Sequence, residues 1–161
     1  MQQLAGSGIV IRPATAADHS TIIALVRAAQ INPFGLDWRR FLVADEQGRV
    51  IGTGQIKPHG DGSRELASIA VLPERRQQGV ASAIVQALVT QEPEPGTLYL
   101  TCQHPLESFY ARFGFRRIDR DEMTPYFKRL ALLAGLLEPV WRVFTTGGVR
   151  LIVMKRGGEE T

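Results

Sequence analysis

The segment from residue 73 to residue 90 carries the clearest chemistry in this sequence. An apolar strand stops at Pro73, a charged loop follows, and an amphipathic helix is expected from about Gly79 to Thr90. The first turn of a helix has about four unpaired N–H groups and roughly half a positive charge. Small residues at this helix start allow a ligand to approach the backbone, an arrangement typical of a pyrophosphate site. The loop Arg76-Gln77-Gln78-Gly79-Val80-Ala81 places a glycine and a small residue at this helix start, and Ser82 offers a hydroxyl in the same turn.

The same loop also permits a plainer interpretation. A glycine at the start of a solvated helix, with Arg75 and Arg76 as surface charges, would produce the same pattern. The spacing matches neither GxxxxGK nor GxGxxG, the two better known phosphate-binding patterns. The loop residues by themselves therefore leave both interpretations open.

The elements that must position this loop alternate between strands and helices. Helices are expected around residues 22–30, 79–90 and 107–113, and residues 121–148 indicate a helix with irregular chain. A hairpin is expected around the turn at residues 46–49. Strands are expected at residues 8–12, 41–44, 50–57, 65–71, 97–102, 115–118 and 149–155. This order predicts an α/β (α+β) fold, with a central mixed sheet flanked by helices.

Length and composition indicate an ordinary globular chain. The 161 residues predict one domain over residues 1–161, with a loose polar tail at 157–161. A single cysteine, Cys102, excludes a disulfide scaffold and a structural zinc site, so no metal is expected. His19 and His59 lack ligand partners nearby in the sequence, and neither is given a role.

Charge and hydropathy bear on partners and location. Nineteen Lys and Arg residues against sixteen Asp and Glu residues give a net charge of +3, with no basic run, so no nucleic acid is expected. The longest apolar stretch, residues 130–137, is too short to cross a bilayer. The N-terminus lacks signal-peptide features, which predicts a cytoplasmic protein. The apolar segment 130–144 is interpreted as core or homodimer contact in preference to membrane contact.

Two motifs in this order resemble the GNAT N-acetyltransferase superfamily. Residues 76–81 are similar to its acetyl-CoA motif, Arg/Gln-x-x-Gly-x-Gly/Ala, which opens a helix after a strand. Residues 108–115, SFYARFGF, resemble its FYxxxGF element, and residues 11–14, IRPA, resemble its opening strand. The resemblance implies the GNAT fold, whose mostly antiparallel sheet is splayed at a bulge.

The resemblance also implies acetyl-CoA, or CoA, as the cosubstrate. The loop and helix start at residues 76–82 would hold the pyrophosphate through backbone N–H groups. The backbone of Ile69, Ala70 and Val71, on the preceding strand, would pair with the pantetheine arm. Amide N–H groups there would also polarise the thioester carbonyl.

Two catalytic roles are implied by the same resemblance. Tyr110 matches the tyrosine that protonates the sulfur of CoA, although a core aromatic on a short helix is the alternative. Glu65 matches the general base of several GNAT subfamilies, although a strand-end carboxylate paired with Arg64 or a neighbour is the alternative. Direct attack of a primary amine on the thioester is the implied reaction.

The amine acceptor is the part least defined by the sequence. Local similarity to the amino-acid acetyltransferase branch favours an amino acid or another small amine, with Lys128, Arg129 or the pair Arg39 and Arg40 as candidates for binding a carboxylate. One alternative is a protein or peptide acceptor, at an N-terminus or a lysine. Another is a regulatory module that binds CoA without turnover.

Overall fold

The computed structural model describes residues 2–3, 8–92, 96–144 and 150–158. The chain divides into two compact units, one made of Met1–Lys57 and Leu66–Pro93, the other of Pro58–Glu65 and Glu94–Thr161. These are called unit 1 and unit 2 below. The expectation of a single domain over residues 1–161 stays a prediction. Residue 149 of the expected last strand, and residues 159–161 of the expected tail, lie outside the described residues.

Unit 1 is built on consecutive strands that pair with their neighbours in chain order. They are β1 (Gln2–Gln3), β2 (Ile9–Pro13), β3 (Phe41–Glu46), β4 (Arg49–Pro58) and β5 (Arg64–Val71), the last two entering the unit with their residues 49–57 and 66–71. The pairings from β1 to β4 are antiparallel. Between β3 and β4 the chain turns on Gln47 (φ 53°) and Gly48 (φ 87°), the left-handed pair that a two-residue hairpin requires.

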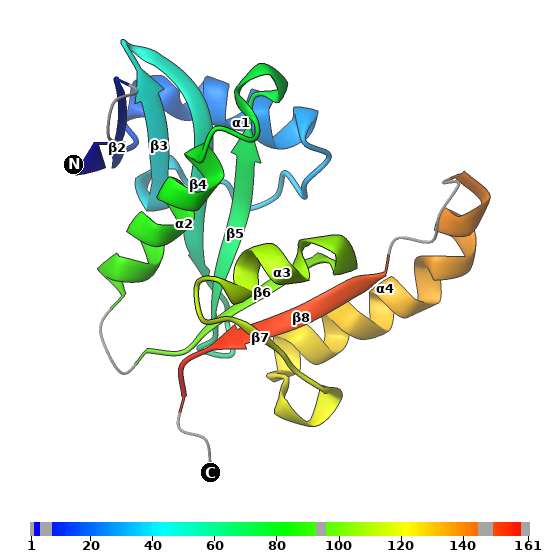
Figure 1. Ribbon diagram of the computed structural model, residues 1–161. Coiled ribbons are helices and arrows are strands. Elements are labelled where there is room, and N and C mark those ends of the chain that lie inside the picture. The colour runs from blue at the N-terminus through cyan, green and yellow to red at the C-terminus, as the bar shows by residue number, and fades with distance from the viewer. Residues whose placement is uncertain (1, 4–7, 93–95, 145–149, 159–161) are drawn as a thin grey trace. The chain divides into compact units, whose positions relative to one another are not determined.

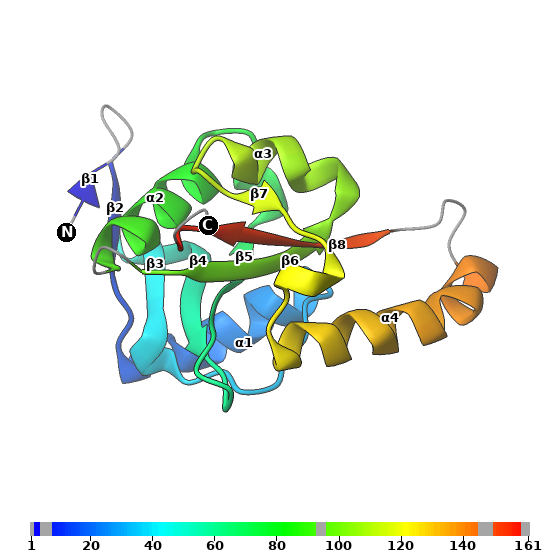
Figure 2. The same cartoon turned by 90° about the horizontal axis from the view of Figure 1, so that it is seen from below.

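Helices α1 (His19–Ala28) and α2 (Val80–Gln91) cover opposite faces of the unit 1 strands (Figure 2). On the α1 face the helix packs through Ile22, Leu25 and Val26 against Phe41 and Val43 of β3. On the α2 face β4 carries glycines, and a Cβ added at Gly54 would lie 2.8 Å from Ile84. The missing side chains therefore allow α2 to pack closely against β4.

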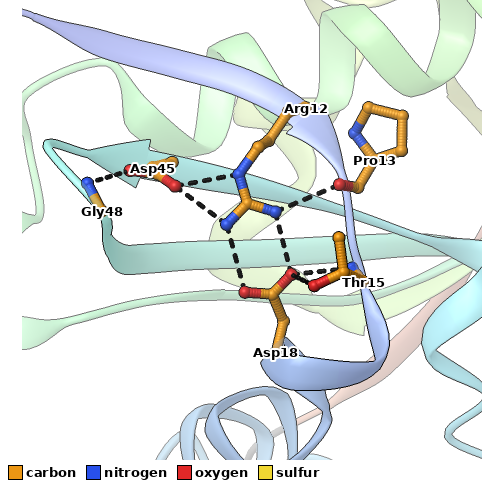
Figure 3. Close-up of polar contacts among 6 residues, drawn as sticks. All are labelled: Arg12, Pro13, Thr15, Asp18, Asp45 and Gly48. Carbon is orange, nitrogen blue, oxygen red and sulfur yellow. Dashed lines mark hydrogen bonds and ion pairs between the residues drawn. The ribbon is translucent and has the colours of Figure 1, made fainter.

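A partly buried ionic network in unit 1 joins β2, β3 and the turn before α1 (Figure 3). Arg12 donates to Asp18 at 2.8 and 3.1 Å and to Asp45 at 2.9 Å. The carboxylate of Asp18 also accepts from the backbone N–H of Thr15, at 2.7 Å. This last bond is part of a capping box formed by Thr15 and Asp18.

Unit 2 contains the strands β6 (Leu98–Gln103), β8 (Leu151–Arg156) and β7 (Arg116–Arg117), in that order and antiparallel. The start of β5 joins them, because Glu65 lies opposite Tyr99 in the one parallel register pair of β5 with β6. Helices α3 (Glu107–Ala111) and α4 (Pro125–Phe144) lie on opposite faces of these strands (Figures 1 and 2). The core on the α4 face consists of Tyr99, Ile118, Phe127 and Val153.

Short 3₁₀ turns connect these elements, at Ala16–Asp18, Trp38–Arg40, Pro73–Arg75, His104–Leu106 and Arg120–Glu122. The expected mixed, mostly antiparallel sheet with flanking helices is confirmed. Two elements differ from expectation: the short strand β1 was not expected, and α4 is a continuous helix of 20 residues within a stretch expected to be partly irregular. No helix within the described residues is long and apolar enough to cross a membrane.

Candidate functional site

The loop before α2 has the backbone geometry of an anion site. Gln77 (φ 60°) and Gly79 (φ 82°) both adopt the left-handed conformation, and Gly79 caps the helix that begins at Val80. The N–H of Ala83 donates to the carbonyl of Gly79 at 3.0 Å, which is the first turn of the helix ladder. The N–H groups before Ala83 have no helical carbonyl one turn earlier, so this end can bind a negative charge.

The side chains of this loop are partly engaged with the protein. The guanidinium of Arg75 donates to the carboxylate of Glu46 at 2.7 and 3.1 Å, so its charge is already paired. Arg76 donates through Nε to the carbonyl of Val71 at 3.3 Å and remains at the surface. Gln78 donates to the carbonyl of Glu74, also at 3.3 Å. The loop therefore offers backbone N–H groups and Arg76 to an anion, and Arg75 serves mainly to fix it to β3.

The last residues of β5 follow an irregular position in the strand. Ser68 has φ 58°, an unusual conformation for a residue inside a strand, and its buried Oγ accepts from Nε2 of Gln55 at 3.0 Å. Beyond it, Ala70 is buried in the core while Ile69 and Val71 are half-buried. The strand is thus distorted just before the three residues that the resemblance assigns to the pantetheine arm.

Glu65, in unit 2, lies against a histidine that the sequence gave no reason to single out. Nε2 of His59 is 2.7 Å from Oε2 of Glu65, and the two side chains are only 6% and 12% exposed. The imidazole stacks on Tyr126 with ring centroids 3.5 Å apart and an interplanar angle of 16°. Glu65 therefore has His59 as a hydrogen-bonding partner.

The turn that carries His59 is fixed at both ends. Its backbone closes through His59 N–H to the carbonyl of Ser63, at 2.9 Å. The carboxylate of Asp61 accepts from the hydroxyl and the N–H of Ser63, and from the N–H of Tyr126 at 2.8 Å. These hydrogen bonds hold the pKa of Asp61 well below its ordinary value, and the bond from the Ser63 hydroxyl has the largest effect. Asp61 consequently ties the turn to the start of α4.

Tyr110, also in unit 2, lies in the aromatic cluster on the α3 face. Its side chain contacts Phe109 and Phe115 edge to face, with centroids 4.9 and 6.3 Å away, and the residue is 9% exposed. Burial raises the pKa of the phenol above its ordinary value, with a smaller contribution from Cys102. The hydroxyl therefore keeps its proton throughout the neutral range.

Burial also keeps the thiol of Cys102 protonated and therefore unreactive as a nucleophile. Burial, and to a smaller extent the charge of Glu107, raises the pKa of its thiol to about 11, and its Sγ lies 3.9 Å from the sulfur of Met154. A thiol that stays protonated is a poor nucleophile.

The predicted site residues fall into three places. The loop at residues 76–82 and the strand end at 69–71 belong to unit 1, whereas Glu65 and Tyr110 belong to unit 2. Within unit 2, His59 stacks on α4, so Glu65 lies on the α4 face, while Tyr110 belongs to the opposite, α3 face (Figure 2). Arg39 and Arg40 lie 3.3 and 4.0 Å from the carboxylate of Asp37.

Sequence reasoning missed His59 and Asp61. The available signal was the turn HGDGS at residues 59–63, which comes directly before Glu65 and between two strands. A turn that reverses the chain brings residues at its two ends close together.

No group of three or more His, Cys, Asp or Glu side chains within the described part of the chain could hold a metal ion.

Comparison with protein families gives one match. The family model described as an acetyltransferase (GNAT) domain matches residues 37–117, about half of the chain. The matched range includes β5, the loop before α2, and Tyr110. An N-acetyltransferase of Chlorobaculum tepidum, itself uncharacterised, is 31% identical over 86 residues, which are 52% of this chain and 54% of that protein. The chain thus spans about half the length of this curated relative.

Solved structures share the fold. N-acetylglutamate synthase from Neisseria gonorrhoeae, complexed with coenzyme A and N-acetyl-glutamate, matches with a TM-score of 0.68 and 16% identity, over 94% of this chain and 35% of that one. Rv2747 from Mycobacterium tuberculosis, crystallised with CoA, matches with a TM-score of 0.67 and 21% identity, over 93% of this chain and 99% of that one.

Proposed function

Because the chain belongs to the acetyltransferase (GNAT) domain family, we propose that it moves the acetyl group of acetyl-CoA to a primary amine. The observation that carries the proposal is the start of α2, where Gly79 in a left-handed conformation precedes the first turn of the helix. This start lies inside the range that the family model matches. Acetyl-CoA supplies an activated thioester carbonyl when it is bound.

The residues proposed to hold the cosubstrate are those of the loop and the strand end. Backbone N–H groups of residues 76–82 bind the pyrophosphate, aided by the positive end of α2 and by the exposed Arg76. The backbone of Ile69, Ala70 and Val71 pairs with the pantetheine arm and polarises the thioester carbonyl. The crystallised neighbours named above hold CoA, which supports the same ligand here.

Glu65 is proposed as the general base. An amine with a pKa near 10.4 is neutral in only about one molecule in 10³ at pH 7, so removal of a proton is needed before attack. The carboxylate of Glu65 takes this proton, directly or through a water molecule, and the neutral amine then attacks the carbonyl carbon. The shielded position of the Glu65 side chain beside His59 suits a carboxylate that must keep one orientation.

Tyr110 is proposed as the general acid. A leaving thiolate with a pKa near 8.5 leaves more readily when it receives a proton. The phenol of Tyr110 is protonated at neutral pH, as an ordinary tyrosine is, and it can give that proton to sulfur as negative charge develops there. The nitrogen of the new amide loses its second proton to solvent, solvent returns a proton to the phenolate of Tyr110, and the products are an amide and a free thiol.

The two proposed catalytic residues lie on different faces of unit 2. Glu65 lies on the α4 face and Tyr110 on the α3 face. We infer that the amine enters on the side of Glu65 and that the sulfur lies on the side of Tyr110. Direct transfer, with no acyl-enzyme, needs a base at the nucleophile and an acid at the leaving group.

The acceptor is proposed to be an amino acid or another small amine. The fold is shared with N-acetylglutamate synthase, whose crystals hold N-acetyl-glutamate, and this likeness supports the small-amine class. The test is an acceptor screen with acetyl-CoA, in which thiol release is followed with amino acids, polyamines and N-terminal peptides. Release that depends on an amino acid or a small amine supports the proposal. Release with peptides alone would move the acceptor to the protein class, and release with no acceptor at all would contradict transfer.

A further inference from the structure

Glu65, the proposed general base, contacts His59, which has no role in the proposed reaction so far. The contact is short, at 2.7 Å, and well shielded, with both side chains close to fully buried. A second pair of the same kind in unit 2, His104 and Glu107, is 3.6 Å long and lies at the surface, with side chains 56% and 35% exposed. A hydrogen bond shielded from water is stronger than one at the surface. The His59–Glu65 contact is therefore the one able to fix an orientation.

The chemistry of the two groups determines where the proton lies. An ionised carboxylate only accepts hydrogen bonds, and a neutral imidazole has one nitrogen that donates and one that accepts. With Oε2 of Glu65 at 2.7 Å, Nε2 of His59 must carry a hydrogen whenever Glu65 is ionised. The bond occupies one of about four lone-pair positions of the carboxylate.

The imidazole cannot easily turn away from Glu65. One face stacks on Tyr126, the edge of Phe127 lies at a centroid distance of 5.9 Å, and both residues belong to the first turn of α4. Asp61, in the same turn as His59, accepts a hydrogen bond from the N–H of Tyr126 and so keeps the turn and α4 together. Tyr99, opposite Glu65, in turn stacks on Phe127 at 5.0 Å. The donor is thus held by aromatic contacts from the first turn of α4, which itself packs on Tyr99 of β6.

We propose that His59 is a positioning residue for Glu65: its Nε2–H donates to Oε2 and holds the carboxylate in the orientation in which it removes the proton of the acceptor amine. This inference rests on the proposed function. The ammonium group of the acceptor loses one proton to the carboxylate, which then passes it to solvent. His59 keeps its own proton throughout, and it touches neither the amine nor the cosubstrate.

Two substitutions of His59 distinguish the effect of its N–H donor from the effect of its aromatic ring. His59→Phe keeps an aromatic ring to stack on Tyr126 but removes the N–H group. His59→Gln keeps an N–H donor at about the same reach but removes the ring. We measure kcat and the KM of the acceptor at saturating acetyl-CoA, and the Kd of acetyl-CoA by calorimetry. The exposed His104→Phe variant is the matched control, and melting temperatures establish that each variant is folded.

The expected result is a loss of kcat by about 10-fold or more in His59→Phe, a part of the ~10²–10⁴-fold that a general base contributes. The Kd of acetyl-CoA stays unchanged, His59→Gln recovers most of kcat, and His104→Phe behaves as wild type. In a Glu65→Gln background, His59→Phe should cause no further loss, because the group that it orients is gone. Full kcat in His59→Phe, or equal losses in the Phe and Gln variants, would overturn the inference.

A measurement on the unmodified protein keeps the inference testable if a variant does not fold. The ¹⁵N chemical shifts of the His59 ring report which nitrogen carries the hydrogen, and we expect Nε2. A hydrogen on Nδ1 alone would place two acceptors 2.7 Å apart and would overturn the inference. Failure of the proposed function has a different signature, since the wild-type protein would then transfer no acetyl group to any amine, and the inference would fall with it.

Discussion

The guanidinium of Arg12 and the carboxylate of Asp18 form a two-point contact, at 2.8 and 3.1 Å, between the end of β2 and the turn that precedes α1 (Figure 3). Asp18 is buried. The hydrogen bond from Arg12, followed in importance by bonds from Thr15, lowers the pKa of Asp18 to about 2, although desolvation acts in the opposite direction. The charge of this carboxylate therefore stabilises the folded chain.

The first prediction concerns the pH dependence of that stability. A carboxyl group whose pKa is lower in the folded protein stabilises it above the unfolded pKa, and this stabilisation is lost as the pH falls through the folded pKa. Asp18→Asn should lower the free energy of unfolding at pH 7 by about 2 kcal/mol. The difference from wild type should shrink as the pH falls from 3.8 toward about 2. Urea denaturation over this range measures it.

The control is Asp119→Asn, which removes an exposed carboxylate that makes no side-chain cap bond. It should leave the free energy of unfolding close to that of wild type at every pH. A deficit in Asp18→Asn that persists unchanged at pH 2 would mean that lost packing, and not lost charge, is responsible.

The second prediction concerns the cosubstrate loop. Gly79→Glu should abolish CoA binding, because a side chain and a negative charge would enter the region of the N–H groups at the start of α2. Gly48→Glu is the matched control, since Gly48 is also left-handed, lies in unit 1, and has open space where a Cβ would stand. Both variants carry the same backbone strain, and only Gly79→Glu should lose affinity in calorimetry. Equal CoA affinity in the two folded variants would refute the assigned phosphate site.

Much of this loop could be predicted from the sequence because its signals are local. Pro73 ends the strand, Gly79 permits the left-handed cap, and the apolar spacing of α2 is that of a half-buried helix. The pairing of Arg75 with Glu46 could not be predicted, since it joins residues 29 positions apart through the register of β3. Local patterns carry no information about which distant carboxylate a surface arginine meets.

The third prediction concerns Tyr110. Tyr110→Phe should lower kcat by about 10²–10⁴-fold while the affinity for CoA stays nearly intact, because only the phenolic proton is removed. Tyr99→Phe is the control, a similarly buried tyrosine on the other face of β6, and it should retain activity. Stopped assays of thiol release give both rates. A Tyr110→Phe variant with the full rate at neutral pH would leave Tyr110 with a packing role only.

The fourth prediction concerns Glu65. Glu65→Gln should slow acetyl transfer most near neutral pH and least in alkaline solution, where the acceptor amine loses its proton without help. The pH profile of kcat, measured with saturating acetyl-CoA, tests this. Glu107→Gln, which alters the exposed His104–Glu107 pair, should reproduce the wild-type profile. A deficit that stays constant from about pH 6 to pH 10 would exclude Glu65 as the base.

The partner of Glu65 illustrates what sequence reasoning could not reach. His59 had no ligand-like spacing to other residues, and its contact with Glu65 depends on the closure of the turn at residues 59–63. Its burial depends on Tyr126, which comes from α4, more than 60 residues later in the chain. The extent of α4 was itself unclear, because its exposed leucines at residues 132, 133 and 136 blur the apolar face of the helix.

The most direct test of acetyl transfer uses acetyl-CoA labelled in the acetyl group. Wild-type protein and Gly79→Glu are incubated side by side with the labelled compound and a mixture of amino acids and other small amines, and the amines are analysed by mass spectrometry. We expect the label on an amine with the wild-type protein and none with Gly79→Glu. Label on no amine with the wild-type protein, or equal labelling by both proteins, would contradict the account.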